Sequence, residues 1–265
     1  MKISIVTISY NQANYIERTI KSIIEQDYED KEYIIVDPGS DDGSRDIIEK
    51  YRDHIDTVIY EKDQGPADGL NRGFSRATGD IWYYLNADDT LLPGTLRKVN
   101  ECFNRYPDAD VISAHGYVID EQDNVIQRFF SHPFSLTAYA TWCCFLMQQS
   151  TFFKPDIFRK INGFNKSNKI CWDGELMVDF ALAGAKFRVI RDNWACFRIH
   201  TNSITVSDQY RARLDKEHLR IRNKILENGY KPFPRPVEWL KVRISDPLST
   251  VERVIDGIIN SDRKL

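Results

Sequence analysis

The sequence lacks the long apolar runs, blocks of like charge and leader features that mark membrane-spanning, nucleic-acid-binding or secreted proteins. It contains no stretch of about 18 apolar residues, so we expect no transmembrane helix. The chain enters a predicted strand at Ile3, without the apolar region or cleavage site of a signal peptide. The net charge of −3 at pH 7 predicts no nucleic-acid partner. We therefore expect a cytoplasmic protein, in the cytosol or at the inner face of the membrane.

Cysteine is scarce, and its pattern excludes a disulfide framework or a zinc site. The chain has five cysteines, an odd number, and no spacing matches a zinc motif. Free thiols in a reducing compartment are the simplest interpretation. No base marks any of them as a catalytic thiol. They are Cys102, Cys143, Cys144, Cys171 and Cys196.

The first 95 residues alternate between apolar strands and helical segments. Short apolar runs at 3–8, 33–36, 57–60 and 81–85 are separated by stretches of helical spacing. This alternation is typical of a parallel sheet covered on both faces, so we expect an α/β fold. In such sheets ligands bind outside the carboxyl ends of the strands.

The predicted strand at 81–85 runs directly into Asn86, Ala87, Asp88 and Asp89. Two adjacent carboxylates at the end of a buried strand are costly unless a cation meets them. A divalent metal carrying a phosphorylated ligand suits this position, because Mg²⁺ and Mn²⁺ prefer oxygen ligands. The alternative is that Asp89 caps a helix that begins near Pro93. This stretch alone does not decide between the two.

Two other acidic turns also follow predicted strands. Asp37 and Asp63 stand after the second and third strands, as Asp88 stands after the fourth. Because parallel strands end at the same edge, we expect the three side chains to converge on one rim. Each turn taken alone is also explained as an Asx turn, with Gly39 and Gly43 supplying positive φ angles.

The second half of the chain leaves more alternatives open. Residues 134–147 are aromatic and apolar without clean periodicity, which fits an active-site loop or a packed wall. Asp173 begins a predicted helix, where the helix N-terminus would lower its pKa or where it would act as a general base. His200 follows a predicted strand and is either structural or a ligand. Predicted strands at 187–190 and 195–199 complete this half.

The composition changes near residue 207. Residues 208–228 and 237–261 are charged and helical, and three prolines lie between them. We expect a helical appendage that packs on the main domain. Dimerisation or contact with a membrane surface are alternative roles.

Together these residues carry a resemblance to glycosyltransferase family 2, the transferases of GT-A fold that use nucleotide-diphospho-sugars. The resemblance covers residues 3–205, and each motif occurs in the family's order. The matching segments are 7–12, 32–44, 63–80, 85–89 with Pro93 and Gly94, 149–153, Asp173, and Arg198 with His200 and Ser203. The last 60 or so residues resemble nothing we can name.

The resemblance implies a fold, a division of the chain and a reaction. It implies a GT-A domain at 1–205, with a nucleotide-binding half at about 1–95 and an acceptor half at about 96–205, followed by the appendage at 206–265. It implies a metal-dependent, inverting transfer of a sugar, with a UDP-sugar favoured as donor. The acceptor would be a hydroxyl of a glycan or of a lipid-linked molecule in surface polysaccharide or glycolipid assembly. Peripheral membrane contact and a homodimer stay open.

The resemblance also implies roles for individual residues. Asp88 would coordinate Mn²⁺ or Mg²⁺ that bridges the two phosphates, His200 would reach the metal or the phosphates from the far side, and Asp89 ranks behind them as a ligand. Asp173 would take the proton from the acceptor hydroxyl. The donor-binding residues would be Thr7, Ser9, Tyr10, Asp37, Asp63, Asn71, Asn86 and Asp88.

Two positions depart from the family pattern. Asn86 replaces the first aspartate of the commonest motif, so an amide would make the contacts there. Pro38 stands where many relatives carry Asp or Gly, and proline has no backbone N–H to donate. Recognition of uracil therefore does not carry over to residue 38, and the base could be another.

Two other functions compete with the transferase. A nucleotidyltransferase that makes the activated sugar would need a glycine-rich, basic loop after the first strand. The loop at 9–12 has neither glycine nor a basic residue. A non-catalytic binding module would most simply have lost its carboxylates, whereas Asp88, Asp173 and His200 are all present. The donor sugar and the acceptor are not determined by the sequence.

Overall fold

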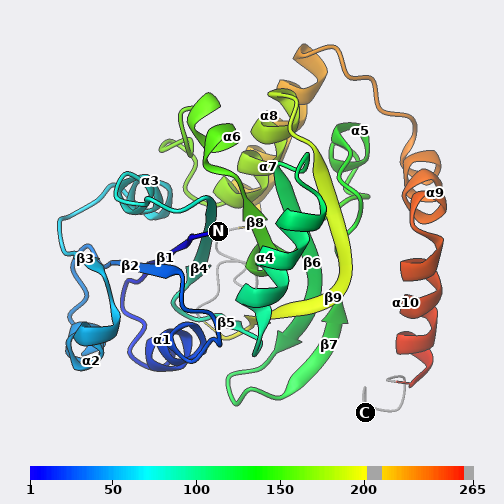
Figure 1. The fold of residues 1–265 in the computed structure, drawn as a ribbon. Coiled ribbons are helices and arrows are strands. Elements are labelled where there is room, and N and C mark those ends of the chain that lie inside the picture. Colours follow the sequence, from blue (N-terminus) through cyan, green and yellow to red (C-terminus); the bar gives the residue numbers. More distant parts are fainter. Residues whose placement is uncertain (202–210, 260–265) are drawn as a thin grey trace.

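The structure, a computed structural model, describes residues 1–201 and 211–259. Within these residues nine strands form one sheet in the order β3-β2-β1-β4-β8-β6-β9-β5, with β7 paired to β6 (Figure 1). The first four strands are parallel, and β8 joins them antiparallel to β4. The strands are β1 (Ile3–Ile8), β2 (Lys31–Val36), β3 (Thr57–Ile59), β4 (Ile81–Asn86), β5 (Thr90–Leu91), β6 (Val111–Ile119), β7 (Val125–Phe129), β8 (Thr151–Phe153) and β9 (Phe187–Arg198).

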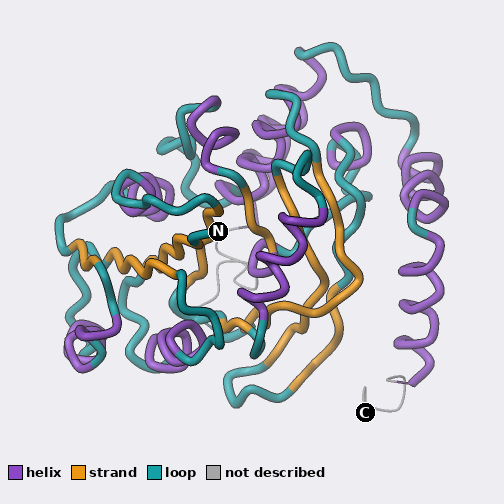
Figure 2. Tube along the Cα trace, in the orientation of Figure 1, coloured by secondary structure: helices purple, strands orange, loops and turns teal. Residues whose placement is uncertain are grey.

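Helices cover both faces of this sheet, as Figure 2 shows. On one face α1, α2 and α4 pack against alternate residues of the strands, such as Ile5 and Tyr83. On the other face α3, α6 and α7 pack against the intervening residues, such as Val6 and Tyr84. The parallel strands read as continuous apolar runs because both of their faces are buried. The helices of this part are α1 (Ile16–Ile24), α2 (Ser44–Lys50), α3 (Pro66–Phe74), α4 (Thr95–Arg105), α5 (Leu136–Tyr139), α6 (Pro155–Lys160) and α7 (Trp172–Leu182), with short 3₁₀ turns η1 (Arg52–His54) and η2 (Gln148–Ser150).

One strand prediction was wrong. The segments 187–190 and 195–199, expected as two strands, form the single strand β9, which pairs in parallel with β6. The polar residues between them suggested a loop. The ladder instead shifts its register beside His115, so the strand bends there while Trp194 stays fully buried. Residues 148–150 form the turn η2, and the chain is extended only from Thr151, where β8 begins.

The C-terminal helices pack on the second half of the sheet domain. They are α8 (Arg211–Glu227), α9 (Arg235–Ser245) and α10 (Pro247–Ile259). Ile221 and Ile225 of α8 are buried against α5 and α7, and Val242 of α9 is buried against Cys143 and Cys144. Packing on the main domain, the favoured expectation for this region, is therefore confirmed for the described residues. None of the helices described at 1–201 and 211–259 has the length and apolar character needed to span a membrane.

Candidate active site

The loops after β1 to β4 meet at a cleft of about 1160 Å³. The strand order predicts that Asp37, Asp63 and Asp88 converge here, because the four parallel strands end at one edge. Asp63 and Asp88 do line the cleft, whereas Asp37 does not. Of the predicted site residues, the cleft is lined by Ser9, Tyr10, Asp63, Asn86, Asp88, Asp173 and His200. Four others, Thr7, Asp37, Asn71 and Asp89, are not among the residues that line it.

Thr7, Asp37 and Asn71 instead hold neighbouring segments of the chain together. The Thr7 hydroxyl accepts a hydrogen bond from Tyr33, and the Asn71 amide bonds both the N–H and the carbonyl of Phe164. Asp37 is fully buried and accepts hydrogen bonds from the loop that follows it, as well as one from Arg45 at 3.0 Å. Burial raises the pKa of Asp37, but these donors outweigh it and hold the pKa below its usual value.

Three buried polar atoms that line the cleft have no hydrogen-bond partner among the described residues. They are Ser9 Oγ, Tyr84 Oη and Asn86 Oδ1. Buried polar atoms are almost always paired, since leaving one unpaired costs about 1–3 kcal/mol. Their gathering on one cleft indicates that a polar ligand completes the site.

The two adjacent aspartates of the β4–β5 turn point in different directions. Asp88 Oδ2 lies 3.0 Å from His200 Nε2 at the cleft. Asp89 is fully buried and accepts hydrogen bonds from the Arg198 N–H and the Gln149 amide, both at 2.9 Å. Burial, followed by the charge of Asp88, raises the pKa of Asp89 well above its usual value. Asp89 thus ties the turn to β9 and η2.

The alternative role of Asp89 as a helix cap is wrong. The helix α4 begins after Gly94, which has a φ of 75°, and no side chain caps it. The Asp89 carboxylate instead accepts a hydrogen bond from the Arg198 N–H of β9, a residue far away in the sequence.

Arg198 and Tyr15 support the cleft, although no sequence pattern predicts a role for either. The fully buried Arg198 side chain donates to the Asp88 carbonyl at 2.8 Å and to Asp123 at 2.6 Å. The Tyr15 ring lies 4.7 Å from the His200 ring. These contacts orient the Asp88 main chain and the His200 side chain. The place of Arg198 in the family motif could have pointed to this role, whereas nothing in the sequence pointed to Tyr15. Ser203, the last residue of that pattern, lies outside the described residues.

The donor set at this position fits a divalent metal that is shared with a ligand. No group of three or more His, Cys, Asp or Glu that could hold a metal occurs within the described part of the chain. The cleft does present the Asp88 carboxylate, the His200 imidazole 3.0 Å away and the unpaired side-chain amide oxygen Oδ1 of Asn86. Mg²⁺ usually binds through one or two protein carboxylates plus substrate phosphates, so this sparse set suits a metal held against a diphosphate.

Asp173 reaches the cleft from the first turn of α7. Burial raises the pKa of Asp173, and the backbone N–H groups of the helix start lower it by less. The expectation that the helix N-terminus would lower this pKa is therefore wrong in sign, because desolvation is the larger effect. The next residue is Gly174, where a Cβ would overlap the Tyr139 hydroxyl. Any larger residue at 174 would force the Tyr139 side chain of α5 to shift away from the start of α7.

The segment at 134–147 is a wall of the cleft. Phe134, Tyr139, Trp142 and Phe145 all line it. The backbone of Trp142 has a φ of 63°, a conformation that bulky residues rarely adopt, and its ring centroid lies 3.8 Å from that of His218 on α8. The predicted appendage therefore contributes a side chain to the cleft, which no local pattern indicated.

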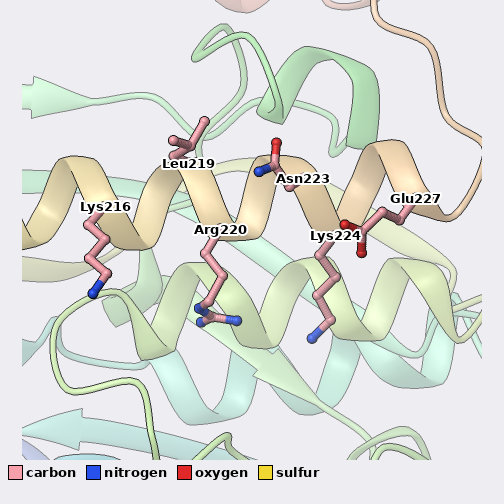
Figure 3. A pocket seen from close by; sticks show the side chains of 6 residues that line it. All are labelled: Lys216, Leu219, Arg220, Asn223, Lys224 and Glu227. Carbon is pink, nitrogen blue, oxygen red and sulfur yellow. The ribbon is translucent and has the colours of Figure 1, made fainter.

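A network of charges fastens α8 to the helix that carries Asp173. The buried Glu175 of α7 accepts hydrogen bonds from Arg220 at 2.7 Å and Lys224 at 3.2 Å, as well as from Asn168 at 2.8 Å. Figure 3 shows Arg220 and Lys224 extending from α8 toward the neighbouring helix. A shallow hollow of about 470 Å³ on this side is lined by residues of α8 alone.

Comparison with known proteins assigns the family. The family model described as glycosyl transferase family 2 matches residues 4–177. The chain belongs to this family. An uncharacterised glycosyltransferase of Nostoc sp. is 31% identical over 215 residues, covering 76% of this chain and 65% of that protein. A Bacillus subtilis protein, TuaG, provisionally named a teichuronic acid biosynthesis glycosyltransferase, is 35% identical over 139 residues, covering 51% and 54%. The chain thus spans just over half to two thirds of the length of these relatives.

Solved structures of the same fold carry nucleotides or nucleotide-sugars. Staphylococcus aureus TarS 1–349 in complex with UDP-GlcNAc matches 93% of this chain and 73% of that one, with a TM-score of 0.68 and 18% identity. The mannosyltransferase PcManGT from Pyrobaculum calidifontis, in complex with GDP-Man and Mn²⁺, matches 91% and 69% with a TM-score of 0.65 and 18% identity. The predictions of a GT-A fold and of an enzyme in the glycosyltransferase class are confirmed.

Proposed function

We propose that this glycosyltransferase moves a sugar from a nucleotide-diphospho-sugar to an acceptor hydroxyl, with inversion at the anomeric carbon. The observation that carries the proposal is that Asp88 with His200 and the separate carboxylate Asp173 face one cleft from different parts of the chain. A single in-line displacement requires a diphosphate-binding site and a general base in the same cavity.

The donor-binding part of the cleft is formed by the loops after β1 to β4. Ser9 Oγ and Asn86 Oδ1 offer unsatisfied polar atoms there, and Tyr10 is an exposed ring at the rim. Asp88 and His200 would hold Mn²⁺ or Mg²⁺, which supplies neutralisation of the charge that develops on the departing nucleoside diphosphate. Pro38 and Gly39 also line the cleft. A nucleobase bound there would receive no backbone hydrogen bond from residue 38, because proline has no N–H.

The general base in this proposal is Asp173. In the transfer the acceptor oxygen forms a bond to the anomeric carbon as the bond from that carbon to the phosphate oxygen breaks, and the acceptor proton passes to Asp173. Burial makes this carboxylate a stronger base than an ordinary aspartate because it disfavours the charged form. One displacement with one base inverts the anomeric configuration.

The aromatic wall supports an acceptor made of sugar. Tyr139, Trp142 and Trp172 line the cleft beside Asp173, and the apolar faces of sugar rings pack well on such rings. We propose a glycan or lipid-linked acceptor in the assembly of a surface polymer, which the name of the Bacillus relative supports. We also keep the division into a donor half at about 1–95 and an acceptor half at about 96–205 as part of this proposal.

The first test is calorimetric titration of UDP and of GDP, each with Mn²⁺ and with EDTA. We expect metal-dependent binding that is lost in Asp88→Ala and kept in Asp156→Ala, a control at a carboxylate that is 92% exposed on α6. Preference for GDP would support the transferase proposal with guanine in place of uracil as the nucleobase of the donor. Binding of neither nucleotide would contradict the proposal.

The second test addresses the base. Asp173→Asn is expected to bind the nucleotide with wild-type affinity but to hydrolyse or transfer the donor about a hundredfold more slowly or worse. Wild-type turnover by this variant would refute the assignment of Asp173. Release of pyrophosphate from a nucleoside triphosphate and a sugar phosphate would favour the nucleotidyltransferase, and tight binding without turnover would favour a binding module.

A further inference from the structure

The helices α9 and α10 form one edge of the molecule, at the right of Figure 1, and are fixed to the body along their inner side. Val242 is buried against α5, and Glu238 accepts a hydrogen bond from the Thr137 hydroxyl at 3.2 Å. On α10, Ser249 Oγ lies 3.3 Å from His115 Nε2, and Glu252 pairs with Arg128 at 3.1 Å. The orientation of both helices is therefore set, and so is the face that they turn outward.

That outward face is apolar along its whole length. Val237, Leu240 and Ile244 follow one another at helical spacing on the side of α9 opposite Val242. Nine of the sixteen exposed large apolar side chains of the described residues lie within positions 233–255. We call these nine the apolar strip; their exposed fractions run from 42% to 68%. They are Phe233, Val237, Trp239, Leu240, Ile244, Leu248, Val251, Val254 and Ile255.

Single exposed apolar residues are ordinary, but a continuous strip of them marks an interaction site. The strip continues on α10, where Leu248, Val251 and Ile255 repeat the spacing of Val237, Leu240 and Ile244. Val251, Val254 and Ile255 lie on the side of α10 opposite the buried Ser249. The strip carries aromatic rings as well, in Trp239 and Phe233. Tryptophan is amphipathic and favours the boundary between water and hydrocarbon, and phenylalanine is common on the apolar face of interfacial helices.

The charges around the strip are sorted by sign. The Glu238 side chain is 1% exposed and accepts the Phe233 N–H, and Asp246 accepts the Ser249 N–H at the start of α10. Of the charged residues at 231–257, only three are exposed and all three are basic, namely Lys231, Arg235 and Lys241. Arg243, Asp246, Glu252, Arg253 and Asp256 are half-buried. Lys241 lies 3.9 Å from the Phe233 ring centroid, and Arg243 lies 5.1 Å from that of Trp239. Lys231 and Arg235 are exposed just before and at the start of α9.

We propose that the apolar strip docks on the surface of an anionic phospholipid bilayer. Aliphatic side chains enter the headgroup boundary, while the flanking lysine and arginine groups meet negatively charged headgroups. Charge decides against a second copy of the chain, because two strips face to face would bring the same basic flanks together while Glu238 and Glu252 stay turned toward the body. This inference does not depend on the proposed reaction.

The test is co-sedimentation of the full chain with vesicles of phosphatidylcholine alone and of phosphatidylcholine mixed with phosphatidylglycerol. We expect binding to the mixed vesicles that weakens with added salt. The variant Leu240→Glu/Val251→Glu should lose about tenfold or more of this binding, since two carboxylates would have to enter the boundary. The matched control is Val125→Glu/Ile126→Glu, which changes aliphatic side chains of similar exposure on β7 and should bind like the wild type.

Three outcomes would overturn the proposal. The first is equal binding of Leu240→Glu/Val251→Glu and the wild type, and the second is no binding of the wild type to mixed vesicles. The third is a wild-type dimer in light scattering without vesicles that becomes a monomer in Leu240→Glu/Val251→Glu, because the strip would then be a subunit interface. Thermal melting of each variant, together with the milder Leu240→Ser, separates loss of docking from loss of folding.

Discussion

Replacing Glu175 by glutamine should destabilise the fold in a way that depends on pH. Burial raises the pKa of Glu175, but the hydrogen bonds from Arg220, Asn168 and Asn165 together with the charge of Lys224 outweigh it and lower the pKa from 4.5 to about 2. A shift of this size corresponds to about 3 kcal/mol of folding stability at neutral pH, at about 1.4 kcal/mol per unit. The side chain is only 2% exposed, so solvent screens this contribution little.

The sign follows from the lowered pKa. The charged form is favoured in the folded state, so the contribution is fully present above the unfolded value of 4.5 and is lost as the pH falls toward about 2. We expect Glu175→Gln to cost about 3 kcal/mol at neutral pH and about 2 kcal/mol less than that near pH 3. Glutamine keeps the size of the side chain, so little of the change comes from packing.

The assay is urea unfolding of wild type and variant across this pH range, wherever the wild type stays folded. The matched control is Glu217→Gln, which removes the other carboxylate bound to Arg220, at 2.7 Å and 22% exposed. A more exposed pair contributes less, so this control should cost below about 1 kcal/mol. A cost of Glu175→Gln that is the same at every pH, or no larger than that of Glu217→Gln, would refute the reasoning.

Three further predictions concern the cleft. Turnover should fall on the acid side at a pH above that of an ordinary aspartate, because burial raises the pKa of Asp173, our proposed base, which must be charged to act; a pH profile of kcat/KM that stays flat there would contradict this. Gly174→Ala should destabilise the fold by about 1–3 kcal/mol, and Tyr139→Phe, which removes the overlapping hydroxyl, should recover part of the loss in a double-mutant cycle measured by urea unfolding. His200→Ala should weaken Mn²⁺-dependent nucleotide binding by about tenfold in calorimetry and leave binding in EDTA unchanged, since the imidazole lies beside Asp88. Equal affinities of His200→Ala and the wild type would place His200 outside the metal site.

The sequence predicted the parallel half of the fold and its rim well, since both depend on local signals. Apolar runs of strand length alternate there with helical spacing, and acidic turns follow three of the strands. Parallel pairing of β1 to β4 then brings the strand ends to one edge, which placed Asp63 and Asp88 on the cleft. No long-range contact had to be known for this step.

The different uses of Asp88 and Asp89 were beyond the sequence. Both carboxylates stand at the end of the same strand, and each alone could face a metal. Besides its neighbour Asn86, the Asp89 carboxylate is bound by Gln149 and Arg198, which are 60 and 109 residues away. Only the placement of β9 and η2 beside the turn buries Asp89 and leaves Asp88 at the cleft.

What the sequence determined by itself was the alternation of strands and helices, the family and the order of its motifs. The tertiary structure decided the rest. Burial turned Asp173 into a carboxylate of raised pKa, packing made the irregular segment at 134–147 a wall, and the Glu175 network brought His218 of α8 into the cleft. The physical reason is that periodicity reports contacts between near neighbours, whereas desolvation and ion pairing depend on which distant residues fold against a side chain.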